Sequence, residues 1–148
     1  LGFSTVCPKA GFQEWTPWLD RDQPTMEGDW ETANAFYPGV DSTACLDGSE
    51  PIAIQCRVRE TQVAWDLVSY HDVLRCDIEY GLHCVNTEVE AIAPELCYQT
   101  QTGRTVCCDD FEVRWYCGVN GAPPTAYNSP PPGTPAVSPP PPSPPPPF

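Results

Sequence analysis

The sequence predicts a small, β-rich domain held together by disulfides, with one short helix, followed by an extended polyproline II tail. Three features predict it: nine cysteines, short segments of alternating apolar residues, and the gathering of fourteen of the twenty prolines in residues 119–148. All twenty-seven Asp, Glu, Lys and Arg residues lie in residues 1–118. We therefore divide the chain into a head, residues 1–118, which can bury a core, and a tail, residues 119–148, which cannot.

The first half of the head is expected to be irregular up to residue 26 and then helical. Residues 29–37 begin with Asp29, a favourable N-cap residue, end before Pro38, and place positions 30, 33, 36 and 37 on one helical face. This is the one helix that the sequence predicts. Residues 52–59 alternate instead, with positions 52, 54, 56 and 58 facing the core and Arg57 facing outward, which indicates a half-buried strand.

The second half of the head is expected to consist of strands and turns. Residues 73–85 predict a strand pair or a loop around Gly81, and the first part of residues 96–117 predicts a hairpin that turns near Gly103. A final strand follows, in which alternate residues face the core. Its expected core residues are Phe111, Val113, Trp115 and Cys117.

The cysteines predict an extracellular protein, because disulfides persist only where thiols are not continually reduced. The odd number leaves one sulfur that is either free or bonded to another chain. The expected disulfide residues are Cys7, Cys45, Cys56, Cys76, Cys84, Cys97, Cys107, Cys108 and Cys117. No apolar window is long enough to cross a bilayer, so we expect secretion to the cell surface, wall or matrix.

Charge and residue types narrow the possible functions. A net charge of −13 argues against nucleic acid as the main partner, because phosphate binding requires a basic surface. The chain contains two histidines, His71 and His83, but neither an HExxH motif nor a nucleophile elbow, so we expect no enzyme. Cys76, His83 and Cys84 are close enough in sequence for zinc, but without paired CxxC spacing disulfides explain the cysteines better.

An acidic segment is the candidate metal site. Carboxylate oxygens on a turning loop suit calcium, although the spacing does not match an EF-hand, and a solvated acidic surface is the alternative. Asp109 and Asp110 form a second, weaker candidate. The candidate calcium ligands are Asp20, Asp22, Asp29 and Glu31.

Trp15 and Trp18 form a W-x-x-W motif, the most specific short signal in the head. Two indoles at this spacing can stack on a sugar or a proline ring, or they can fill a small core. In secreted proteins this motif is also the acceptor pattern for C-mannosylation of its first tryptophan, which here is Trp15.

The tail contains two consecutive Ser-Pro-Pro-Pro-Pro units, residues 138–142 and 143–147. Consecutive prolines favour polyproline II, which rises about 3.1 Å per residue and would give a strap of about 90 Å. Because neither Asn86 nor Asn128 stands in an N-x-S/T sequon, we expect glycans on the tail's hydroxyl groups, including hydroxylated prolines. The expected sites are Ser129, Pro130, Pro131, Pro132, Thr134, Ser138, Pro139, Pro140, Pro141, Pro142, Ser143, Pro144, Pro145, Pro146 and Pro147.

The order of motifs in residues 7–117 resembles the cysteine-rich WxxW (CysD) domain of gel-forming mucins, also found in cartilage intermediate layer proteins. The motifs are Trp15 to Asp20, Gly28 to Thr32, Ile54 to Arg57, Cys76 to Cys84, and Cys107 to Asp110. The resemblance implies a non-catalytic extracellular module with disulfides, calcium, C-mannosylation and weak self-association.

The chain departs from this family where Gln13 replaces a cysteine usually found two residues before the first tryptophan, which points to Cys7 as the odd sulfur. The stretch between Cys108 and Cys117 is also longer than is usual in the family. The tail is similar to extensins, which implies hydroxyprolines carrying arabinose-type chains and serines carrying galactose.

Together these features predict a structural glycoprotein that polymerises with itself in a secreted fibril or matrix. The stiff tail of one copy would dock head-to-tail in an aromatic groove on the next, because a polyproline II ligand is already ordered. The alternative is a carbohydrate-binding or adhesion module with the tail as a spacer. The candidate assembly residues are Trp15, Trp18, Trp30 and Trp115.

Overall fold

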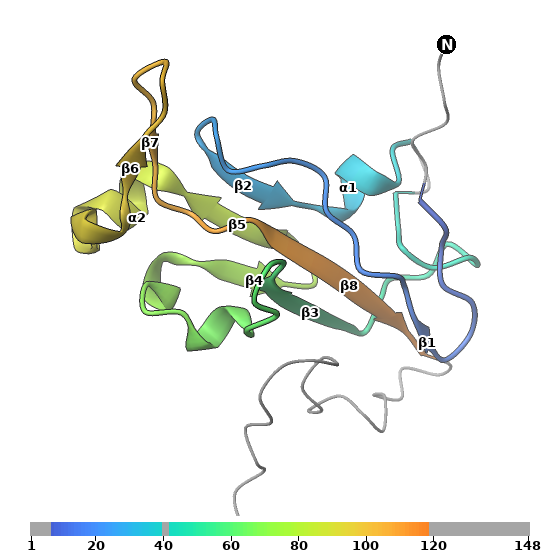
Figure 1. Cartoon of the computed structure of the whole chain (residues 1–148). Helices are drawn as coiled ribbons and strands as arrows, with labels where there is room; N and C mark the ends of the chain where they lie inside the picture. The colour runs from blue at the N-terminus through green and yellow to red at the C-terminus, as the bar shows by residue number, and fades with distance from the viewer. Residues whose placement is uncertain (1–6, 40–41, 119–148) are drawn as a thin grey trace, which may run out of the picture.

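The computed structural model describes residues 7–39 and 42–118, and in these ranges two three-stranded antiparallel sheets share one core (Figure 1). The first sheet has the order β1 (Glu14–Trp15), β8 (Phe111–Cys117), β3 (Ala53–Val58). The second has the order β2 (Gly28–Glu31), β5 (Gly81–Val85), β4 (Arg75–Asp77). A separate hairpin pairs β6 (Tyr98–Gln99) with β7 (Thr105–Val106).

Short helices connect these strands. The α-helices are α1 (Ala33–Phe36) and α2 (Asn86–Ile92). Three single turns of 3-10 helix, η1 (Trp65–Leu67), η2 (His71–Val73) and η3 (Pro94–Leu96), lie in the connections after β3 and α2. The small β-rich fold with few helices therefore agrees with the class that the sequence predicts. The tail and its expected polyproline II conformation lie outside the described residues.

Strand β8 supplies the centre of the core. Phe111, Val113 and Trp115 are each 0% exposed, and they pack with buried side chains of the second sheet such as Leu82. The ring of Phe36 from α1 packs edge-on against Trp115, with centroids 5.9 Å apart. The alternation predicted for this strand is confirmed, as are the β4–β5 pair around Gly81 and the hairpin whose turn contains Gly103.

The predicted helix over residues 29–37 is wrong for its first half. Residues 28–31 form β2, which pairs with β5 along its whole length, and only Ala33–Phe36 are helical. The alternation of apolar and polar residues that marks a strand is reversed here. The inward positions are the carboxylates Asp29 and Glu31, and the partly exposed position is Trp30. The prediction of a single helix is also wrong, because α2 is a second one. The sequence does not reveal α2, since it presents only Asn86 and Val89 to the core and so shows no apolar stripe.

Two glycines allow β2 and β5 to approach closely. Gly81 has a φ of +76°, and a β-carbon there would collide with the carbonyl of Glu31. A β-carbon on Gly28 would collide with the carbonyl of Cys84. These glycines set the position of β2, and therefore of the two buried carboxylates that it carries.

Four disulfides link segments that strand pairing does not join. The pairs are Cys45–Cys117, Cys56–Cys76, Cys84–Cys108 and Cys97–Cys107. Cys7 belongs to none of them, as the departure at Gln13 predicted. Cys76 and Cys84 bond to different partners, so the zinc alternative is excluded. Closing loops of 72 and 24 residues stabilises the head by restricting its unfolded chain.

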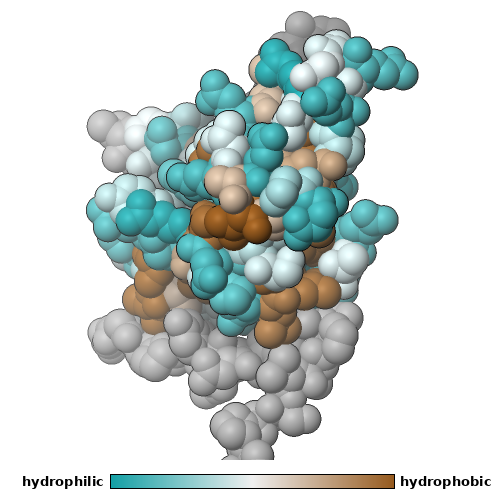
Figure 2. All heavy atoms as spheres, turned by 90° about the vertical axis from the view of Figure 1, so that its left-hand side faces the viewer, coloured by the Kyte–Doolittle hydropathy of each residue, from teal (hydrophilic) through white to brown (hydrophobic). Residues whose placement is uncertain are grey.

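The surface at the α2 end of the molecule is mostly hydrophilic, with separate apolar patches (Figure 2). Ile92 and Leu96, in α2 and η3, are 52% and 44% exposed there. None of the described helices is long and apolar enough to cross a membrane.

Candidate functional site

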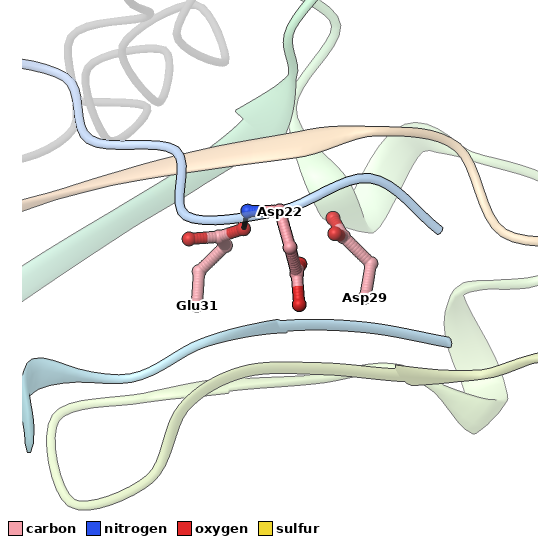
Figure 3. Close-up of side chains that lie close together, drawn as sticks. All are labelled: Asp22, Asp29 and Glu31. Carbon is pink, nitrogen blue, oxygen red and sulfur yellow. Dashed lines mark hydrogen bonds between the residues drawn. The ribbon is translucent and has the colours of Figure 1, made fainter. Parts of the chain in front are cut away.

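Three carboxylates from two segments converge between β2 and the loop that precedes it. Asp29 and Glu31 stand two residues apart in β2, so both point to its inward face, and Asp22 reaches them from the preceding loop. One ligand oxygen from each residue lies within 4.8 Å of the others. Figure 3 shows the Asp29 and Glu31 side chains rising from β2 toward the loop that carries Asp22.

Backbone amides hold two of these carboxylates in place. Phe111 donates its amide to Asp29 Oδ2 at 2.7 Å, and Arg21 donates its amide to Glu31 Oε2 at 2.7 Å. Asp22 Oδ1 and Asp29 Oδ1 are buried and accept no hydrogen bond from the described residues. The other oxygen of Asp22, Oδ2, lies 2.6 Å from the guanidinium of Arg21. Buried oxygens that lack a donor are available to a cation.

The electrostatics of the cluster also favour a cation. Asp29 and Glu31 are both 0% exposed. Burial, together with the neighbouring carboxylates, raises the pKa of Asp29 to about 10 and that of Glu31 to about 9. The cluster therefore either retains protons or binds a positive ion. An all-oxygen donor set suits a hard cation such as calcium, which takes six to eight oxygens, so three carboxylates would supply part of the shell.

The structure does not bring Asp20 into this cluster, although the sequence predicted it as a ligand. Its carboxylate forms an ion pair with Arg59 at 2.9 Å, while burial and the nearby Asp110 raise its pKa to about 6. The weaker candidate pair is also divided. Asp109 accepts a hydrogen bond from Tyr70 Oη, whereas Asp110 lies 3.6 Å from Arg59.

The W-x-x-W motif is interleaved with two arginines. The Arg114 guanidinium lies 4.5 Å from the ring centroid of Trp15 and 4.7 Å from that of Trp18, and the Arg57 guanidinium lies 3.7 Å from Trp18. We call Trp15, Arg114, Trp18 and Arg57 the Trp–Arg ladder. It covers the outward face of β3 and β8, where Arg57 is only 5% exposed.

Sequence reasoning assigned Arg57 to a solvent-facing position and therefore missed this ladder. Alternation placed it correctly on the outward face of β3, but the segment that contains Trp18 folds over that face. The sequence did contain a signal for the ladder: a basic residue at an outward position in each of two strands, Arg57 and Arg114, together with the W-x-x-W motif. Arg57 also lies 3.5 Å from Glu112.

Asn86 is a further structural centre that the sequence did not indicate. Its side-chain oxygen accepts the amides of Cys107 and Cys108 at 2.8 and 2.9 Å. Its side-chain nitrogen donates to the carbonyls of Pro24 and Met26 at 3.2 and 3.1 Å. One buried amide thus joins the start of α2 to the segment before β2 and to two disulfide cysteines.

The remaining candidate tryptophans have different surroundings. Trp115 is 0% exposed in the core, so the expectation that it lines a surface groove is wrong. Trp30 is partly exposed on the outward face of β2, with its ring centroid 6.4 Å from that of His83. The expected glycosylation residues lie in the tail, outside the described residues.

A β domain of this size with four disulfides is typical of small secreted modules. The family model described as the Mucin-2 protein WxxW repeating region matches residues 15–99 and 95–117, and the chain belongs to this family. It is also 30% identical to human Mucin-5B over 116 residues, which cover 76% of this chain. The matched region is about 2% of the length of Mucin-5B.

Proposed function

We propose that the chain is a non-catalytic, secreted structural glycoprotein, a protomer or repeat of an extracellular fibril or matrix assembled by head-to-tail docking of its tail. The observation that carries this proposal is the joining of a head from the WxxW family to thirty residues without any charge. Membership of a family named for mucins, together with four disulfides, supports an extracellular location. Head-to-tail contacts that do not close produce filaments.

Calcium has a structural role in this proposal. Asp22, Asp29 and Glu31 would hold the ion, which would neutralise carboxylates that burial and mutual repulsion otherwise oppose. The ion would also connect β2 to the loop before it, so calcium would stiffen the edge of the second sheet. The orphaned oxygens of Asp22 and Asp29 support this role.

C-mannosylation of Trp15 is a further part of the proposal. The Trp15 side chain is partly exposed and lies at the end of the Trp–Arg ladder. Its ring centroid is 5.2 Å from that of Tyr116. Mass spectrometry of the tryptic peptide from secreted protein should find the added mass of one hexose on Trp15. A Trp18→Ala variant should lose this addition, because the second tryptophan completes the acceptor motif.

The alternative function, a carbohydrate-binding module that uses Trp15 and Trp18, has less support. Guanidinium groups already lie over both rings, two of them over Trp18. A sugar would have to displace an arginine or use the ring edges.

Electron microscopy of the secreted protein tests the assembly directly. Regular fibrils, with an intact mass above the 16.3 kDa of the polypeptide, are expected. Removing residues 119–148 should abolish the fibrils while leaving the head folded, and a tail of equal length with Gly and Ser in place of Pro is the matched control. Monodisperse particles of the full chain, or fibrils that persist without the tail, would contradict the proposal.

A further inference from the structure

A partly exposed row of aromatic rings crosses the outward face of the second sheet. In the strand register, His83 lies beside Trp30 on one side and Arg75 on the other, so the three side chains share a face. Tyr80, in the turn between β4 and β5, stacks on Arg75 with the guanidinium 4.1 Å from its ring centroid. The ring centroids of Trp30 and His83 are 6.4 Å apart, and those of His83 and Tyr80 are 6.2 Å apart.

This row leads into an open groove of about 640 Å³. Tyr80 and Ile78, on its wall, are 41% and 38% exposed. The groove also presents hydroxyl and amide groups, from Thr32, Asn34 and Ser42. Apolar rings beside polar donors make a surface suited to a ligand with apolar rings and hydrogen-bond acceptors.

We propose that this Trp30–His83–Tyr80 row binds the Pro-rich tail of a second copy of the chain. This inference rests on the proposed function, because it names the surface on which head-to-tail docking occurs. Among the candidate tryptophans, Trp115 is buried, and Trp15 and Trp18 are covered by guanidinium groups and are less exposed than Tyr80. Tyr80 also contacts one guanidinium, that of Arg75, but 41% of its surface remains exposed, and Trp30 is the remaining candidate tryptophan.

The row suits a Pro-rich segment, because consecutive prolines favour polyproline II. A polyproline II helix rises about 3.1 Å per residue, and neighbouring ring centroids in the row are 6.4 and 6.2 Å apart, so the three rings span at most about four residues of such a helix. Proline has a carbonyl acceptor but no N–H, and the groove supplies the matching hydroxyl and amide donors. Residues 138–147 provide ten consecutive residues of this kind.

Charge and reach are also compatible with a second copy as the source of the ligand. The tail has no charged residue, so it can lie beside Arg75, Glu50 and Glu79 without burying a charge of its own. Burial and Arg75 lower the pKa of His83, which keeps its ring neutral at neutral pH. Thirty residues in polyproline II would extend about 90 Å, which is long enough to reach a neighbouring head.

Binding of a synthetic peptide with the sequence of residues 129–148 to the full chain tests the site. Tyr80→Ala should weaken binding about tenfold, because an exposed ring that stacks on the ligand is lost. Tyr98→Ala is the matched control, since Tyr98 is 59% exposed on β6, away from the groove. The affinity of this variant for the peptide should stay within about twofold of that of the unchanged chain. Equal affinities of the two variants would overturn the proposal.

Two further measurements separate the possible failures. A peptide with Gly in place of Pro should not bind. Binding of neutral oligosaccharides that Tyr80→Ala weakens, without any binding of the tail peptide, would overturn the proposal and assign the row to glycans. If tail removal abolishes fibrils but Tyr80→Ala does not weaken binding of the peptide, the proposed docking surface is wrong, while the proposed assembly through the tail is supported. If fibrils persist without the tail, the proposed function itself fails.

Discussion

The guanidinium of Arg57 lies 3.7 Å from the ring centroid of Trp18 and is also within 3.5 Å of Glu112. The Arg57 side chain is only 7% exposed, so this cation is largely removed from water and depends on both partners. A desolvated cation–π contact is worth about 2 kcal/mol, several times more than an exposed one. The Trp–Arg ladder therefore contributes to stability as well as covering the sheet.

A double-mutant cycle measures this contact. Trp18→Leu and Arg57→Met should each destabilise the protein, and their coupling free energy should be about 2 kcal/mol in urea unfolding. The pair Arg75 and Tyr80 is the matched control, because it has a similar geometry at 4.1 Å but both side chains are largely exposed. Its coupling should be about 0.5 kcal/mol, and equal couplings would contradict the burial argument.

Calcium should raise the stability of the folded head. At a concentration 100 times its dissociation constant, an ion that binds only the folded state adds about 2.7 kcal/mol to the free energy of unfolding. Asp29→Asn with Glu31→Gln should abolish this response without lowering the melting temperature in EDTA, because both carboxyl groups are protonated when no metal is present.

Glu90→Gln, at an exposed position in α2, is the control for calcium and should respond like the natural protein. Thermal unfolding with and without calcium gives all three comparisons. A calcium response that survives the double substitution would show that the ion binds elsewhere.

Without calcium, stability should fall as the pH rises. The pKa values of Asp29 and Glu31 are raised to about 10 and about 9 in the folded state, so between about pH 4 and pH 9 the folded protein holds protons that the unfolded chain has released. Each group contributes at most about 1.4 kcal/mol per pH unit. Urea unfolding in EDTA at pH 5.5 and 8.5 should show lower stability at the higher pH, and saturating calcium should reduce the difference. Stability that rises with pH in EDTA would be the opposite result.

Asn86→Ala should destabilise the head by about 2–4 kcal/mol, because four hydrogen bonds are lost and buried backbone groups remain unsatisfied. Asn34→Ala removes an exposed amide and should change stability by less than about 0.5 kcal/mol. Urea unfolding of the two variants makes the comparison. Similar small effects would mean that the surrounding backbone reorganises to find other partners.

Local patterns in the sequence were sufficient for much of the fold. The alternation around Trp115 predicts β8, and Gly81 and Gly103 mark the turns of two hairpins, because turns and half-buried strands depend on neighbouring residues. The odd cysteine could be assigned to Cys7 from a missing cysteine at position 13. All three carboxylates of the cluster, Asp22, Asp29 and Glu31, were among the predicted candidate ligands, although the strand that carries two of them was predicted as a helix.

The sequence by itself determined the class of the protein: a head rich in cysteine with a W-x-x-W motif, and a tail of proline without charge. Only the tertiary structure decided which groups meet. Trp18 reaches Arg57, Asp22 joins β2 while Asp20 turns to Arg59, and Asn86 gathers four backbone groups. These contacts join segments that are distant in the chain, and their partners are chosen by strand pairing and burial, which no local pattern of residues records.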